Sequence, residues 1–150
     1  MMAFVDDDLA FDTMGESRMM PHLVEWLRSR RWLRQDSVVV REFPINGRRV
    51  DLVTMTKSGV LSAFELKLGG FARVLEQATY NRQNFDRSWI VVGNSPRPSN
   101  VDEAARFGVG IIVVTGAKPS VLIRPGSPDF DWQSRYRARK RLMEIGEFHV

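Results

Sequence analysis

The sequence predicts one α/β domain (in the α+β sense) built on a mixed β-sheet with helices on both faces. The first half of the chain holds three β-branched or apolar runs joined by tight turns, which favours an antiparallel meander. The second half alternates strand-like and helix-like runs, which favours parallel pairing through crossover helices. At 150 residues and 43% hydrophobic content, the chain is long enough for a single core.

The first element we expect is a helix over residues 17–32, because Met20, Leu23 and Leu27 recur at helical spacing. Pro21 fits only in the first turn of that helix. Residues 1–15 carry three consecutive aspartates and read as a flexible arm. The arm lacks the basic start of a secretory signal. The predicted domain therefore covers residues 16–150.

The remaining elements follow in order along the chain. Residues 37–43 form a strand, and the Asn-Gly pair at 46–47 is a strong hairpin signal. We then expect two hairpin strands on either side of residues 56–60, a helix over 71–84, a strand over 88–93, a helix from Ser99 or Asn100 to Phe107, strands over 109–115 and 121–123, and a helix over 130–145.

The central hairpin brings charged side chains together. If its loop is residues 57–59, with Gly59 in the left-handed conformation, Thr56 faces Val60. The same register places Asp51 opposite Glu65, with about 5.5 Å between their backbones. Lys67 projects from the same face because side chains alternate along a strand.

Two carboxylates on one half-buried face are costly unless a cation joins them. Oxygen ligands from Asp and Glu, without His or Cys, suit Mg²⁺ or Mn²⁺. The helix after the hairpin adds a polar stripe at helical spacing beside its apolar stripe. The stripe consists of Arg73, Gln77, Tyr80 and Asn84. A metal, a lysine and such donors suit metal-assisted hydrolysis of a phosphodiester.

Asp51, a 13-residue gap, Glu65-Leu66-Lys67 and the later Gln77 and Tyr80 resemble the PD-(D/E)xK nuclease superfamily. The order of elements also resembles that superfamily's restriction-endonuclease-like core. Two departures stand out: Val50 occupies the position of the proline before the Asp, and the helix motif reads Gln-x-x-Tyr where many members have Gln-x-x-x-Tyr.

The resemblance implies a divalent metal held by Asp51, Glu65 and the backbone carbonyl of Leu66. It implies that Lys67 is catalytic, with Gln77 and Tyr80 as further catalytic candidates. A glutamate on the first helix often completes such sites, and Glu16 is the candidate here. It also implies a Mg²⁺-dependent deoxyribonuclease that hydrolyses DNA.

A net charge of +4 is compatible with a polyanionic partner. The candidates for nucleic-acid contacts are Arg48, Arg49, Arg73, Arg82 and Arg139. The chain has no cysteine and no apolar run long enough for a bilayer, so we expect a cytoplasmic protein with no membrane partner.

Two alternatives remain open at this point. The first is an inactive protein of the same fold that binds nucleic acid or serves as a subunit of a larger complex. The second is an unrelated α/β interaction domain in which the charges are structural. The sequence also leaves open DNA versus RNA, endo versus exo action, the number of metals and whether the chain forms a homodimer.

Overall fold

The computed structural model describes residues 18–67, 70–127 and 132–146. The predicted flexible arm lies outside the described residues. The sheet has six strands, arranged in the order of the chain. They are β1 (Val38–Ile45), β2 (Arg48–Met55), β3 (Leu61–Lys67), β4 (Arg87–Val92), β5 (Gly110–Thr115) and β6 (Lys118–Ile123).

Pairing within the sheet confirms the predicted fold class. β1, β2 and β3 pair antiparallel, as expected for a meander. β3, β4 and β5 pair parallel, and β6 returns antiparallel to β5. Two crossover helices, α2 (Phe71–Asn81) and α3 (Pro98–Arg106), connect the parallel strands.

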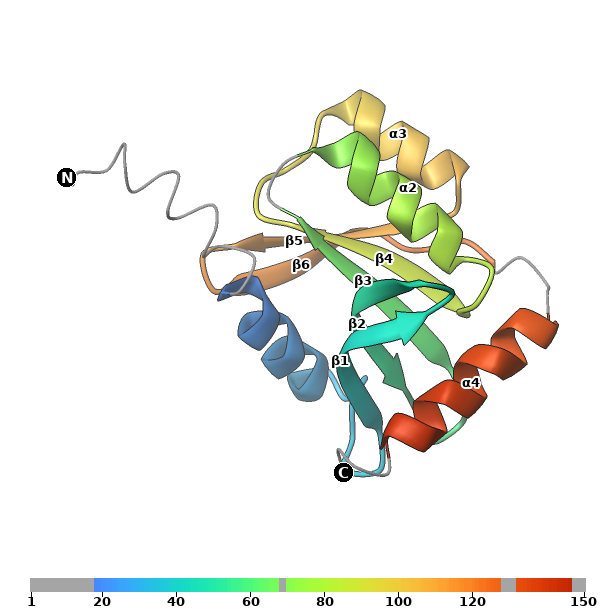
Figure 1. The fold of residues 1–150 in the computed structure, drawn as a ribbon. Helices are drawn as coiled ribbons and strands as arrows, with labels where there is room; N and C mark the ends of the chain where they lie inside the picture. Colours follow the sequence, from blue (N-terminus) through green and yellow to red (C-terminus); the bar gives the residue numbers. More distant parts are fainter. Residues whose placement is uncertain (1–17, 68–69, 128–131, 147–150) are drawn as a thin grey trace.

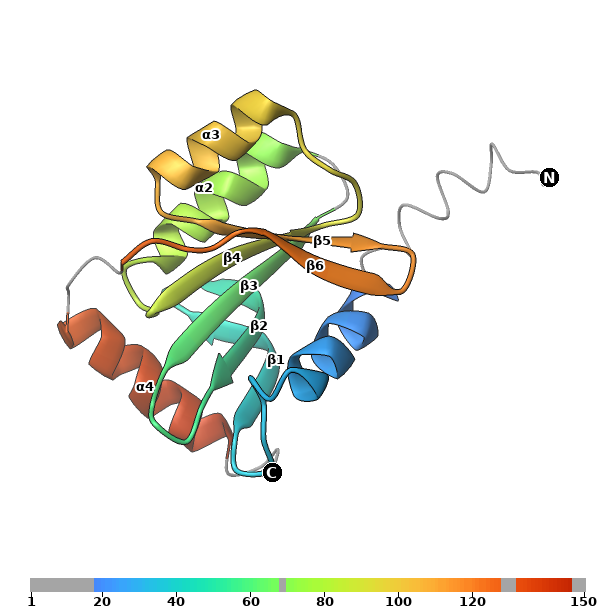
Figure 2. The same ribbon diagram turned by 180° about the vertical axis from the view of Figure 1, so that it is seen from behind.

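Helices cover both faces of the sheet (Figures 1 and 2). The N-terminal helix, residues 18–29, places Leu23 and Leu27 in a core cluster with Phe64 and Trp89 on one face. On the other face, α2 and α3 pack over β4 and β5, while α4 (Trp132–Gly146) packs over β1–β3. Glu65 lies on this second face, between the core under α2 and the core under α4.

Several element boundaries differ from the prediction. The N-terminal helix ends at residue 29 and not at 32, and β6 begins at Lys118 and not at residue 121. Three further differences have local reasons. β1 continues through Pro44 to Ile45, which is possible because β1 is an edge strand. α3 begins at Pro98, since a proline is well suited to the first position of a helix. α2 ends at Asn81, so Asn84 follows the helix and does not extend its polar stripe.

The first hairpin bends beside the predicted site. Glu42 adopts a left-handed conformation with φ 55°. Beyond it, Phe43 pairs with Val50, and both side chains enter the core under α4. The bend therefore directs the far end of the hairpin toward α4 and leaves Asp51 at the corner.

Candidate functional site

The register of the central hairpin is as predicted. Gly59 has φ 92°, and its N–H donates to the carbonyl oxygen of Thr56 over 2.9 Å. β2 and β3 then pair from Met55 with Leu61 to Leu52 with Phe64. One further step in the same register brings Asp51 opposite Glu65.

Asp51 follows the last backbone pair between β2 and β3, Leu52 with Phe64, and its side chain contacts the backbone of β3. The backbone N–H of Leu66 donates to Asp51 Oδ2 over 2.8 Å. This bond fixes the Asp51 carboxylate against β3, next to Glu65.

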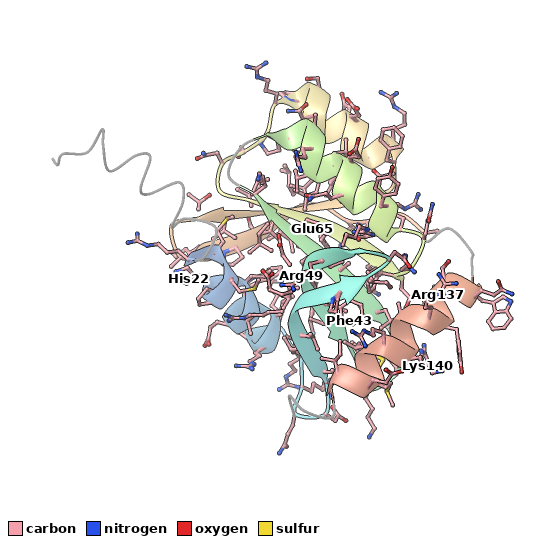
Figure 3. All side chains as sticks on the ribbon, in the orientation of Figure 1. His22, Phe43, Arg49, Glu65, Arg137 and Lys140 are labelled. Atoms are coloured by element: carbon pink, nitrogen blue, oxygen red, sulfur yellow. The ribbon has the colours of Figure 1, made fainter. Side chains whose placement is uncertain are left out.

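Glu65 is the most deeply buried acidic side chain of the site, at 2% exposure. Asn81 Nδ2, at the end of α2, donates to Glu65 Oε2 over 2.9 Å. Arg48 Nη1 lies 4.0 Å from the same oxygen. Figure 3 shows Glu65 on β3 beneath α2.

Burial raises the pKa of Glu65 from 4.5 to about 7. Hydrogen bonds oppose this rise, while the negative charge of Asp51 adds to it. Burial likewise raises the pKa of Asp51, against the effect of its bond from Leu66. The two carboxyls therefore hold less than their full negative charge near neutral pH.

Lys67 ends β3 on the same face and is partly buried. Its positive charge acts to lower the pKa of Asp51, against the larger effect of burial. The structure thus brings Asp51, Glu65 and Lys67 together, as the hairpin register predicted.

The contribution of α2 differs in detail from the predicted stripe. Asn81 is fully buried against Glu65 and is a residue that the sequence reasoning missed. It lies four residues after Gln77, the spacing of the Gln-x-x-x-Tyr motif, and that spacing was the signal that could have found it. Tyr80 is 55% exposed, and Gln77 is partly buried one turn before Asn81.

Arg48 was predicted as a nucleic-acid contact and lies at the carboxylate site. Besides its approach to Glu65, its guanidinium lies over the Tyr80 ring at 5.9 Å from the centroid. Burial lowers the pKa of Arg48, although the neighbouring Glu65 acts in the opposite direction. Tyr80 therefore reaches the site through Arg48.

The other predicted nucleic-acid contacts are scattered. Arg49 is exposed and pairs with Glu42 over 3.7 Å. Arg73 is exposed near the start of α2, about 12 Å along the helix from Asn81 at 1.5 Å per residue. Arg82 donates to the backbone carbonyl of Ser127. Arg139 donates to the carbonyl of Gly59 over 2.9 Å, so it braces the hairpin loop.

The donor set fits a hard divalent cation. Asp51 and Glu65 offer carboxylate oxygens, and Leu66 offers a carbonyl between Glu65 and Lys67. Within the part of the chain that the structure describes, the buried Asn81 Oδ1 has no hydrogen-bond partner. A metal-bound water would supply one. Across these same described residues no three acidic, His or Cys side chains gather at one point. Glu16, the expected third carboxylate, lies outside them.

Fold and site together define a mixed α/β protein with a pair of carboxylates, one buried and one partly buried, beside a lysine and an arginine. The family model of bacteriophage P4 protein cII matches residues 10–128, and the chain belongs to this family. No curated protein matches the sequence. Of the helices in the described ranges, none is long and apolar enough to span a membrane.

The solved structures that are similar to this chain include the following two. The SPO1766 protein of unknown function from Silicibacter pomeroyi is 18% identical, with a TM-score of 0.58, over 82% of this chain and 77% of that one. This likeness shows a shared fold. SfsA from Pyrococcus furiosus, in complex with Ca²⁺, is 14% identical over 79% of this chain and 62% of that one. Its TM-score of 0.38 is too low to carry an argument about this protein.

Proposed function

We propose that this protein is a divalent-metal-dependent nuclease of the PD-(D/E)xK type that hydrolyses phosphodiester bonds in DNA. The observation that carries the proposal is the meeting of Asp51, Glu65 and Lys67 where β2 and β3 separate. Two carboxylates and a lysine at this position match the residue types and spacing of that superfamily. The mixed sheet flanked by helices is compatible with its core.

Each residue has a role in the proposed reaction. Asp51, Glu65 and the Leu66 carbonyl would hold Mg²⁺ or Mn²⁺. The bound ion would polarise the phosphate and lower the pKa of an attacking water. Lys67 would orient that water or stabilise the developing negative charge. Asn81 positions the Glu65 carboxylate, because its amide donates to Oε2.

Arg48 suits a role on the substrate. Its guanidinium is only partly buried, with 28% of the side chain exposed, and it already lies beside Glu65. Arginine binds phosphate oxygens through two parallel donors. Arg48 would therefore hold the scissile phosphate against the carboxylates, and Tyr80 would support its guanidinium from the other side.

The test is cleavage of single-stranded, duplex and branched DNA in Mg²⁺ or Mn²⁺. Glu65→Gln and Lys67→Ala should each lower the rate by about 10² or more, as expected for removal of a group that acts in the transition state. Glu76→Gln, an exposed glutamate on α2, is the matched control and should cleave as wild type. Equal cleavage by wild type and the two site variants on every substrate would refute the proposal.

One observation favours a second candidate, a protein of this fold that binds nucleic acid without cleaving it. Arg48 gives Glu65 a cation from the protein itself, at 4.0 Å. If Arg48 takes the place of a metal ion beside Glu65, the protein will bind DNA in a salt-sensitive manner. Mg²⁺ will then neither induce cleavage nor change the thermal stability of the protein.

A further inference from the structure

A basic groove separates the turn of the first hairpin from α4. It has a volume of about 400 Å³, and the hairpin side of its lining includes Pro44, Ile45, Asn46 and Gly47. Four arginines also line it, namely Arg48, Arg49, Arg137 and Arg141. None of the eight lining residues is acidic. Figure 3 shows Arg137 on α4 and Arg49 on the hairpin.

Four of the five basic residues of α4 form two rows with different partners, and the fifth is the exposed Lys140. Arg135 and Arg139, four residues apart, bind within the protein, to the Asp86 carboxylate and the Gly59 carbonyl. Arg137 and Arg141, also four residues apart, line the groove. Arg141 makes an ion pair with the exposed Glu144 at 3.8 Å. Such an exposed pair contributes little and leaves the guanidinium available to a stronger anion. One row thus anchors the helix and the other faces the groove.

The two walls are held at a fixed separation by one buried residue. Asn46 Nδ2, in the turn, donates to Asn84 Oδ1 over 3.2 Å. Asn84 Nδ2 in turn donates to the carbonyl of Ser134 on α4 over 3.0 Å. Asn84 itself is 1% exposed, and both bonds of the bridge are partly buried. The groove is therefore a preformed surface of the fold.

Arg48 belongs to both the groove and the carboxylate site. It lines the groove and approaches Glu65 within 4.0 Å. We propose that this groove binds consecutive phosphates of a nucleic-acid strand and leads that strand to Asp51 and Glu65. The direction of the strand toward the carboxylates rests on the proposed nuclease function. The binding of the strand by the four arginines does not.

A phosphodiester backbone fits this groove better than a single small anion does. Four guanidinium groups over two walls offer more donors than one phosphate accepts, although three of them also lie within 4.0 Å of a glutamate, whereas a strand presents a phosphate at each nucleotide. Arginine also matches phosphate through a planar pair of donors. An acidic peptide carries similar charge, so the experiment must distinguish binding of an acidic peptide from binding of a nucleic-acid strand.

The experiment measures binding of a fluorescent 20-nucleotide single strand and the corresponding duplex by anisotropy, in EDTA, over a range of salt concentrations. EDTA prevents metal-dependent cleavage, so binding is measured apart from the proposed chemistry. The test variant is Arg137→Ala/Arg141→Ala, and Arg49→Ala tests the opposite wall. Arg28→Ala/Arg87→Ala removes two exposed arginines from the N-terminal helix and the start of β4, and serves as the charge-matched control.

The groove variant should bind roughly tenfold more weakly near 0.1 M salt, with a salt slope for the single strand lower by about 1.4, the value for two lost phosphate contacts. The control double variant should lose less than about twofold. Equal losses in both double variants, at unchanged melting temperature, would overturn the inference. Equal competition by polyglutamate of the same charge would also overturn it, because the groove would then accept any acidic polymer.

The two proposals fail separately. If the groove variants lose strand binding and the wild type shows no Glu65-dependent cleavage, the strand-binding proposal stands and the nuclease proposal is refuted. If the wild type shows Glu65-dependent cleavage and the groove variants bind the strand as wild type does, the nuclease proposal stands and the strand-binding proposal is refuted.

Discussion

Replacing Glu65 by Gln should stabilise the metal-free protein at alkaline pH. Glu65 is 2% exposed, and burial raises its pKa to about 7 in the folded protein, against 4.5 ordinarily. The folded state therefore holds a proton that the unfolded state releases. Stability from this proton is fully present below pH 4.5 and is lost as the pH rises through 7. Glutamine keeps the shape and never ionises.

The size of the effect follows from the two pKa values. A difference of 2.5 units corresponds to about 3 kcal/mol of unfolding free energy at pH 8. Some of this stability is already lost at pH 5, so the unfolding free energy of wild type should fall relative to that of the variant by about 2–3 kcal/mol between pH 5 and pH 8. Removing the 4.0 Å contact with the partly exposed Arg48 offsets this by less than about 1 kcal/mol.

Urea unfolding in EDTA at pH 5 and pH 8 measures this difference. Glu76→Gln on the exposed face of α2 is the matched control, and its stability should stay within about 0.5 kcal/mol of wild type at both pH values. The reasoning is wrong if the difference between Glu65→Gln and wild type is the same at pH 5 and pH 8. It is also wrong if the variant is the less stable protein at pH 8.

Three further predictions follow from the same structure. At pH 8, Mg²⁺ at ten times its dissociation constant should stabilise wild type by about 1.4 kcal/mol in thermal melts and Asp51→Asn by much less. The affinity of wild type for Mg²⁺ should tighten from pH 6 to pH 8, because the ion displaces the Glu65 proton. An equal stabilisation of both proteins would contradict a metal site at Asp51. Asn84→Ala removes two partly buried hydrogen bonds and should cost about 1–3 kcal/mol in urea unfolding. A loss below about 0.5 kcal/mol would show that the bridge between the turn and α4 does not contribute to stability. Glu42→Gly should raise the unfolding free energy by about 1 kcal/mol, since glycine adopts φ 55° without strain; a destabilised variant would mean that the side chain matters more than the backbone conformation.

The central part of the site could be predicted because its geometry is local. A three-residue loop with Gly59 in the left-handed conformation fixes which residues of β2 and β3 face each other. Alternation along the strands then places Asp51, Glu65 and Lys67 on one face. No long-range packing is needed for this step.

The surroundings of the carboxylates could not be predicted in the same way. α2 ends three residues earlier than its apolar pattern suggested, and the residue at its end, Asn81, is the one that binds Glu65. The sequence predicted Arg48 as a surface contact for nucleic acid. In the structure the first hairpin bends at Glu42, and Arg48 lies 4.0 Å from Glu65. A positive φ at a glutamate leaves no signal in the sequence.

The sequence by itself determined the order of the elements, the mixed sheet and the register that pairs Asp51 with Glu65. Hydrophobic period and turn chemistry act over a few residues, so they can be read along the chain. Only the tertiary structure decided that Glu65 is buried, that Asn81 and Arg48 lie next to it, and that Arg137 and Arg141 line the groove beside the hairpin turn. Those contacts join segments far apart in the chain, and the packing of α2 and α4 on one sheet face fixes them.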